Sequence, residues 1–329
     1  MRYRELGRSG IEVSEFALGC WPFAGGDIWG YQDDNDSIAT ARAALDAGIN
    51  FFDTAEGYGD GHSEDVLGQA LEGRRHEAVI ATKVGDSHLK PEDVRASCER
   101  SLRLMRTDYI DLYQIHWPNH DIPISETMGE LERLKEEGKI RAIGVCNFGP
   151  KDLDDLLAFG HTETDQLPYN LTWRAIEYEI QPKCVENGIG LICYSPLAQG
   201  ILAGRYASAD EVPPGLARSR HFSKDRPMSQ HGEPGCEREL FEAVDRVQAV
   251  AERLDEPMAS VALAWVRQQP GVTSLLVGAR NPEELQWNLP AFELTLPDDA
   301  VRELSKATEE VKQKIGDNPD MWRSPGRMR

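Results

Sequence analysis

The sequence has no apolar run that approaches the roughly 20 residues needed by a membrane-spanning helix. Its first ten residues, MRYRELGRSG, lack the apolar core of a secretion signal. We therefore expect a soluble, cytoplasmic protein with no membrane partner.

Paired cysteine motifs are also missing. The six cysteines form no CxxC pair, and no set of Cys and His has the spacing of a zinc site. In a chain of 329 residues this pattern favours reduced thiols. The sequence predicts no bound metal.

Positive charge is scarce, because 36 Lys and Arg stand against 56 Asp and Glu, which gives a formal net charge of −20. A surface of this sign repels nucleic-acid phosphates, so we expect no nucleic-acid partner. Adaptation to high salt and an ordinary acidic enzyme both explain the charge. No Gly/Ser-rich linker divides the chain, so we expect one domain over residues 1–329, with 317–329 as a tail.

Short apolar segments alternate with amphipathic helical patterns along most of the chain. Several segments are almost continuously apolar, which is typical of parallel strands covered on both faces. Eight β/α units in about this length predict a (β/α)₈ TIM barrel. The expected strands are 15–20, 49–54, 78–84, 109–116, 140–147, 164–170, 190–196 and 273–278.

Two segments lie outside this repeat. Residues 2–14 are expected to form a β-hairpin that plugs the bottom of the barrel. Residues 197–236 form a long polar connection after the seventh strand, and a loop of this length is usually functional or mobile. Among the helix starts, Ser63 is the expected N-cap of the helix after the second strand.

Polar residues follow three consecutive predicted strands. Asp53 ends the second strand, with Tyr58 in the following loop, Lys83 lies near the end of the third, and His116 ends the fourth. Catalytic residues of such barrels lie at the carboxyl ends of the strands. A buried lysine needs a partner, and Asp53 on the neighbouring strand is a candidate.

This residue set suits the reduction of a carbonyl group. A nearby ammonium lowers the pKa of a phenol, a carboxylate holds the ammonium, and a histidine orients the reacting oxygen. Taken singly, each residue has a structural explanation: Tyr58 as a loop tyrosine, Asp53 as a turn residue, His116 as a core histidine. The pair Lys83–Asp53 also has one, as a structural ion pair.

The motifs GINFFDTAEGYGDGHSEDVLGQAL, IATKVG, DLYQIHWPN, KIRAIGVCNF, YSPLAQGILAGRY and LLVGARNPEELQWNL resemble the aldo-keto reductase family over about residues 3–310. The resemblance is to the bacterial-type branch and also to potassium-channel beta subunits. It implies NADP(H) as cofactor and a catalytic tetrad of Asp53, Tyr58, Lys83 and His116. In that tetrad Tyr58 is the proton donor.

The resemblance also assigns the cofactor contacts. Asn147 and Gln166 match the residues that bond the nicotinamide carboxamide. Tyr194 matches the ring that stacks on the nicotinamide. At the adenosine end the matching residues are Arg280, Glu284 and Asn288. Cys146 stands where the family often has serine, so its part is doubtful. Arg218 and Arg220 are further candidates for the pyrophosphate. Along the pyrophosphate and the start of the last barrel helix the expected residues are Ser195, Leu197, Gln199, Gly200, Leu202, Gly204, Arg205 and Gly278.

The expected substrate pocket is apolar, with four tryptophans as candidate walls that are equally common as core or rim residues: Trp21, Trp29, Trp117 and Trp173. The sequence thus predicts an NADP(H)-dependent reductase of an aldehyde or ketone, with a small molecule as its partner. An NAD(P)-dependent dehydrogenase of a sugar or polyol, running the same site in the oxidative direction, is the alternative. A regulatory subunit that binds NADPH is a second alternative.

Overall fold

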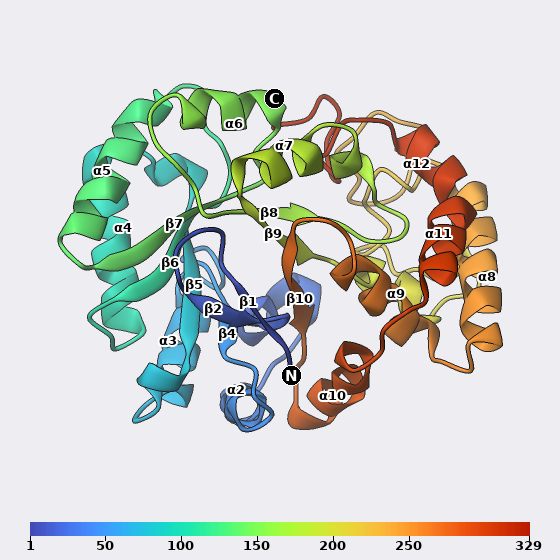
Figure 1. Cartoon of the computed structure of the whole chain (residues 1–329), viewed down its shortest axis with the longest axis horizontal. Helices are drawn as coiled ribbons and strands as arrows, with labels where there is room; N and C mark the ends of the chain where they lie inside the picture. Colours follow the sequence, from blue (N-terminus) through green and yellow to red (C-terminus); the bar gives the residue numbers. More distant parts are fainter.

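The computed structural model describes residues 1–329, except for the side chains of residues 27 and 28. Its centre is a closed barrel of eight parallel strands in which β10 pairs with β3 (Figure 1). The predicted (β/α)₈ barrel is therefore confirmed. The strands are β3 (Phe16–Gly19), β4 (Phe51–Asp53), β5 (Val79–Val84), β6 (Ile110–Ile115), β7 (Ile140–Cys146), β8 (Thr164–Pro168), β9 (Gly190–Tyr194) and β10 (Val272–Gly278).

Helices surround the barrel and bury the outer faces of its strands. Every residue of β5 and of β6 is buried, because one face points into the barrel and the other packs against helices. No described helix is long and apolar enough to cross a membrane. The helices are α1 (Gly26–Trp29), α2 (Asp34–Asp46), α3 (His62–Ala70), α4 (Pro91–Leu104), α5 (Ile124–Glu136), α6 (Pro150–Leu157), α7 (Ile180–Asn187), α8 (Glu237–Arg253), α9 (Met258–Arg267), α10 (Pro282–Asn288), α11 (Asp298–Ala307) and α12 (Glu309–Ile315).

The expected N-terminal hairpin is present. Strands β1 (Tyr3–Glu5) and β2 (Glu12–Ser14) pair in antiparallel register. Leu6, Ile11 and Val13 belong to one buried apolar cluster with barrel residues such as Phe51 and Leu112. The hairpin therefore closes one end of the barrel and leaves the carboxyl ends of the strands for the polar residues.

The prediction that Ser63 caps α3 is wrong. The helix begins at His62, and Gly61 occupies the N-cap position with a left-handed φ of 87°. The Ser63 hydroxyl instead donates to the carbonyl oxygen of Cys20 and accepts from the Thr54 hydroxyl. Ser63 therefore joins α3 to the strand ends beside Asp53.

The connection between β9 and α8 has two different halves. It begins with a short 3-10 helix, η5 (Ala198–Ala203), and the following Arg205 is exposed and makes no hydrogen bond through its guanidinium among the described residues. Arg220, in contrast, is buried. It donates to the carbonyl oxygens of Ile315, at the end of α12, and of Asn318 in the tail. The second half of the loop is thereby fastened to the end of the chain.

The tail, residues 317–329, returns across the carboxyl end of the barrel. In Figure 1 the C-terminus lies beside α6, far from α12 where the tail begins. The backbone N–H of Arg329 donates to Asp152 Oδ2 of α6 at 2.8 Å. The guanidinium carbon of Arg327 lies 3.4 Å from the ring centre of Trp117. The tail is therefore a wall of the barrel mouth.

The two halves of the long loop should differ in their sensitivity to trypsin. We expect the first cut within residues 197–236 after Arg205, because this side chain is exposed without a described partner and exposed loop residues are preferred sites of proteolysis. Mass spectrometry of a time course identifies the site, and Arg205→Gln, which should lose this cut, is the control. Cleavage after Arg220 while the bond after Arg205 stays intact would contradict the anchoring described above.

Candidate active site

The structure brings together the four residues that the sequence places on three consecutive strands. The Lys83 ammonium donates to Asp53 Oδ1 at 2.6 Å and to the carbonyl oxygen of Thr54 at 2.7 Å. It also lies 3.3 Å from the Tyr58 hydroxyl. Lys83 and Asp53 are both buried, so the pair exists only because the barrel provides these acceptors.

Two glutamines hold the second oxygen of Asp53. Gln166 Nε2 donates to Asp53 Oδ2 at 2.7 Å, and Gln114 Nε2 donates to it at 3.2 Å. Gln114 was missed by the sequence reasoning. Its signal is its position two residues before His116 on a strand, which places both side chains on the same face. Its strand neighbour in register is Lys83.

Aromatic rings surround the Tyr58 hydroxyl. The His116 ring meets the Tyr58 ring edge-on, with 5.8 Å between ring centres. On the other side the Trp21 ring stacks on Tyr58, also at 5.8 Å, and Trp29 meets Trp21 edge-on at 5.5 Å. Trp21 and Trp29 therefore lie at the mouth beside Tyr58, where the sequence expected pocket walls.

Burial determines the protonation states at this mouth. It raises the pKa of Tyr58 to about 12, although the Lys83 ammonium acts in the opposite direction. Burial, together with the charges of Lys83 and Arg327, lowers the pKa of His116 to about 3. Burial is the largest single effect on Lys83 and lowers its pKa, but Asp53, Tyr58 and Cys146 together outweigh it, so the pKa of Lys83 lies above its usual value. At neutral pH Tyr58 therefore carries its proton, His116 is neutral, and Lys83 is charged.

The Lys83 ammonium lowers the pKa of Tyr58 as expected, but the net pKa still lies above that of a free phenol. Removal of the phenol from water is the larger effect.

Strained backbone marks the residues expected at the nicotinamide. Asn147, Ser195 and Gln199 have left-handed φ values of 62°, 53° and 56°. Non-glycine residues rarely adopt this region, and such strain concentrates at ligand sites. The Tyr194 hydroxyl donates to Asn147 Oδ1 at 2.9 Å, which fixes the tyrosine ring beside Asn147.

The segment expected along the pyrophosphate forms η5 and the turn after it. Leu202 is buried and anchors this turn, while Gly204 and Arg205 are exposed. Gly200 has a φ of 95°, so a side chain at this position would be strained. Leu197 packs against the main apolar core. Gly204 and Arg205 are therefore the exposed positions of this segment.

The residues expected at the adenosine end gather around the start of α10. Arg280 follows β10 and its backbone N–H donates to Glu284 Oε2 at 2.9 Å. Asn288 Nδ2 donates to the carbonyl oxygen of Glu284, so both polar side chains contact their own segment. Gly278 is the exposed last residue of β10. No described carboxylate lies within ion-pair distance of the Arg280 guanidinium.

The prediction that Trp173 lines the pocket is wrong. Its side chain has no exposed surface and packs in a buried cluster with Met321 of the tail. The His221 ring meets it edge-on at 5.2 Å. Trp117 is partly exposed under Arg327, so it borders the mouth as expected.

The arginines of the long loop also differ from their expected part. The Arg220 guanidinium donates to Glu233 and to the carbonyl oxygens of Ile315 and Asn318, so these donors are not free for a phosphate. The Arg218 guanidinium lies 4.5 Å from the ring centre of Trp322. Both residues therefore position the tail.

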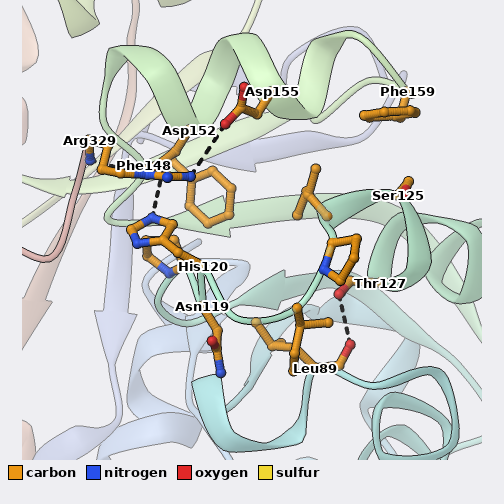
Figure 2. Close-up of a pocket in the computed structure, with 14 residues that line it drawn as sticks. Leu89, Asn119, His120, Ser125, Thr127, Phe148, Asp152, Asp155, Phe159 and Arg329 are labelled. Atoms are coloured by element: carbon orange, nitrogen blue, oxygen red, sulfur yellow. Dashed lines mark hydrogen bonds and ion pairs between the residues drawn. The ribbon is translucent and has the colours of Figure 1, made fainter.

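A pocket of about 260 Å³ lies beside the mouth and is separate from the four residues. Figure 2 shows its apolar floor and a polar edge where Arg329 lies near Asp152, Asp155 and His120. His120 Nε2 and Asp152 Oδ1 are 2.9 Å apart, so the polar edge is internally paired. The pocket shares no residue with the predicted site.

The sequence matches the model of the Aldo/keto reductase family over residues 15–309. The chain belongs to this family. It is 35% identical over 297 residues to "Aldo-keto reductase YhdN" of Bacillus subtilis (strain 168), covering 87% of each protein. It is also 35% identical over 335 residues to "NADH-specific methylglyoxal reductase" of Escherichia coli (strain K12), covering 94% of this chain and 100% of that protein.

Solved aldo/keto reductases share the fold of this family member. The glycerol dehydrogenase AKR11B4 from Gluconobacter oxydans superimposes with a TM-score of 0.80 and 33% identity, covering 96% of each chain. An aldo-keto reductase from Klebsiella pneumoniae in complex with NADPH gives a TM-score of 0.74 and 29% identity, over 93% of this chain and 94% of that chain. The predicted family and enzyme class, an oxidoreductase acting on carbonyl or alcohol groups, are therefore confirmed.

Replacing Lys83 in this aldo/keto reductase should destabilise the fold. Lys83→Met leaves Asp53 buried without its cation, and breaking a buried pair in this way costs about 3–5 kcal/mol. Urea unfolding followed by circular dichroism measures the change. Lys83→Met combined with Asp53→Asn should recover part of the loss, and Lys151→Met, at an exposed lysine, should be neutral. An unchanged unfolding free energy in Lys83→Met would show that the pair is not formed.

Proposed function

We propose that this chain is an NADP(H)-dependent reductase of aldehydes or ketones, with Tyr58 as the proton donor. When bound, NADPH supplies a hydride to the carbonyl carbon, Tyr58 gives its proton to the carbonyl oxygen, and the products are an alcohol and NADP⁺. The observation that carries the proposal is the position of a protonated Tyr58 beside Lys83, with a neutral His116 at the same mouth.

The site residues have different roles at the carbonyl group. A donor must carry a transferable proton at working pH, and the Tyr58 phenol does so, whereas neutral His116 keeps one ring N–H but lacks the acidic proton of an imidazolium. Neutral His116 can orient the carbonyl oxygen toward Tyr58. Lys83 stabilises the phenolate that forms after proton transfer, and Asp53 with its two glutamines keeps Lys83 in place.

The residues around the mouth fit a nicotinamide cofactor. Gln166 donates from Nε2 to Asp53, and its side-chain Oε1 has no partner among the described residues, so Oε1 could accept from a carboxamide. The strained Asn147 and Ser195 would hold the nicotinamide, and the partly exposed Gln199 and Gly200 of η5 would hold the pyrophosphate. Arg280 would hold the adenosine end. Two solved relatives from Klebsiella pneumoniae are complexes with NADPH or with NADP and acetate.

The relatives support two directions of the same chemistry. One is named a methylglyoxal reductase and another a glycerol dehydrogenase. Methylglyoxal and glycerol are both three-carbon molecules. We favour reduction of a small aldehyde or ketone. Oxidation of a polyol by the same residues is the second candidate. Turnover with methylglyoxal plus NADPH and with glycerol plus NADP⁺ compares the two directly.

Tyr58→Phe should abolish carbonyl reduction while NADPH binding stays nearly intact. Phenylalanine has no proton to give, and loss of a general acid in this setting costs about 1,000-fold or more in kcat. Steady-state turnover and fluorescence titration with NADPH measure the two effects. Tyr178→Phe, at an exposed tyrosine, is the control. Near-normal turnover of pure Tyr58→Phe would show that Tyr58 is not the proton donor.

The chain should prefer NADPH over NADH, although one relative is named NADH-specific. The 2′-phosphate of NADPH needs a local cation in a chain of net charge −20, and Arg280 is the candidate. A charge-assisted contact of this kind is typically about 1.5–3 kcal/mol, or roughly 10- to 150-fold. Arg280→Ala should lower the ratio of kcat/KM for NADPH to that for NADH by a factor in this range.

The exposed α5 residue Arg133 provides a control, since Arg133→Ala removes one positive charge away from the site. The proposal for Arg280 fails if the wild-type chain favours NADH. It also fails if Arg280→Ala and Arg133→Ala have the same ratio of kcat/KM for NADPH to that for NADH.

A further inference from the structure

Gln32 connects the loop before α2 to Arg280, nearly 250 residues later in the chain. Its Nε2 donates to the carbonyl oxygen of Arg280 at 2.7 Å, and its Oε1 accepts from Arg280 Nε at 3.1 Å. The neighbouring carbonyl oxygen of Tyr31 accepts from Arg280 Nη2 at 2.6 Å. The amide of Gln32 therefore contacts both the backbone and the side chain of Arg280.

These contacts use only one edge of the guanidinium. The edge formed by Nε and Nη2 faces Gln32 and Tyr31, while Nη1 has no hydrogen-bond partner among the described residues. The edge that contains Nη1 has the fork geometry that matches phosphate oxygens. Gln32 thus fixes the direction in which the remaining N–H groups point.

Three acids that follow Arg280 or Gln32 in the sequence, Glu284, Asp33 and Asp34, have other partners. Glu284 accepts the backbone N–H of Arg280 and makes no ion pair with its guanidinium. Asp33 accepts from the backbone N–H of Asn35 as the N-cap of α2, and Asp34 pairs with His62. In a chain with 20 more acids than bases, an arginine without a carboxylate partner among the described side chains can bind an external anion.

We propose that Gln32 is a positioning residue that sets the preference for the 2′-phosphate of NADPH by holding Arg280 with its free edge outward. This inference rests on the proposed function and adds a second residue to its cofactor selection. The amide is the required group because it donates to the Arg280 carbonyl and accepts from Nε at the same time. A carboxylate cannot donate, so it would repel the carbonyl oxygen and would pair with the cation.

Residue 32 therefore controls whether Arg280 is available. Glutamine leaves the positive charge for the cofactor, whereas glutamate would neutralise it and repel the phosphate. The experiment uses the full chain and compares Gln32→Glu, Gln32→Leu and Arg280→Ala with the wild type. The probes are adenosine 2′,5′-bisphosphate and adenosine 5′-monophosphate, which differ only in the 2′-phosphate, and titration calorimetry gives each Kd.

We expect Gln32→Glu to raise the Kd for the bisphosphate by about tenfold or more and to leave that for the monophosphate within about twofold. Gln32→Leu, which adds no charge, should give a smaller rise of the same kind. Its effect should disappear in the double variant with Arg280→Ala, because Gln32 acts through that arginine. In turnover, the KM for NADPH should rise in Gln32→Glu, while kcat and the KM for NADH should stay nearly constant.

Gln313→Glu, an exposed position on α12, makes the same charge change away from this site and should alter neither Kd. The inference is overturned if neither Gln32 variant changes the Kd for the bisphosphate, if the two probes weaken equally, or if the effect of Gln32→Leu persists without Arg280. It is also overturned if the wild type binds both probes equally. Wild type that prefers the bisphosphate but reduces no carbonyl compound would instead overturn the proposed function and leave this inference standing.

Discussion

The buried ion pair between Lys83 and Asp53 is the interaction on which the site depends. Neither charge has appreciable contact with water, so each is stable only because the other is present and because further groups complete its hydrogen bonds. The carbonyl oxygen of Thr54 serves Lys83, and Gln114 and Gln166 serve Asp53. Four strands supply these groups, so the complete set of hydrogen bonds around the pair requires the folded barrel. Catalytic geometry and folding are thereby linked at one point.

The features that could be predicted from the sequence are those set by strand periodicity. Eight apolar segments predict the barrel, and the polar residues at the ends of three of them predict the tetrad, because parallel strands end at the same edge. Gln114 carries the same signal through its spacing from His116, yet a buried glutamine in a strand has many structural explanations. Ser63 shows the opposite error, since its type favours a cap but Gly61 alone fits the backbone that the turn requires.

The features that could not be predicted depend on contacts between distant segments with no periodic pattern. Trp173 looks like a pocket residue in the sequence, and only the course of the tail shows that Met321 covers it. Arg220 looks like a phosphate ligand until the carbonyl oxygens of the tail occupy its donors. Gln32 carries no motif at all. For such residues the side-chain type gives the capacity to bond, and the partner is set by the fold.

Burial and charge act in opposite directions on Tyr58, and their balance suits a proton donor. Burial makes the phenolate costly, so Tyr58 keeps its proton at rest. In the proposed proton transfer, Lys83, 3.3 Å away, would lower that cost when the proton leaves. A fully solvated phenol would feel little from the same ammonium, because water screens the charge. The rings of Trp21 and His116 pack against Tyr58, so in the proposed reaction they would limit the water that weakens the effect of Lys83.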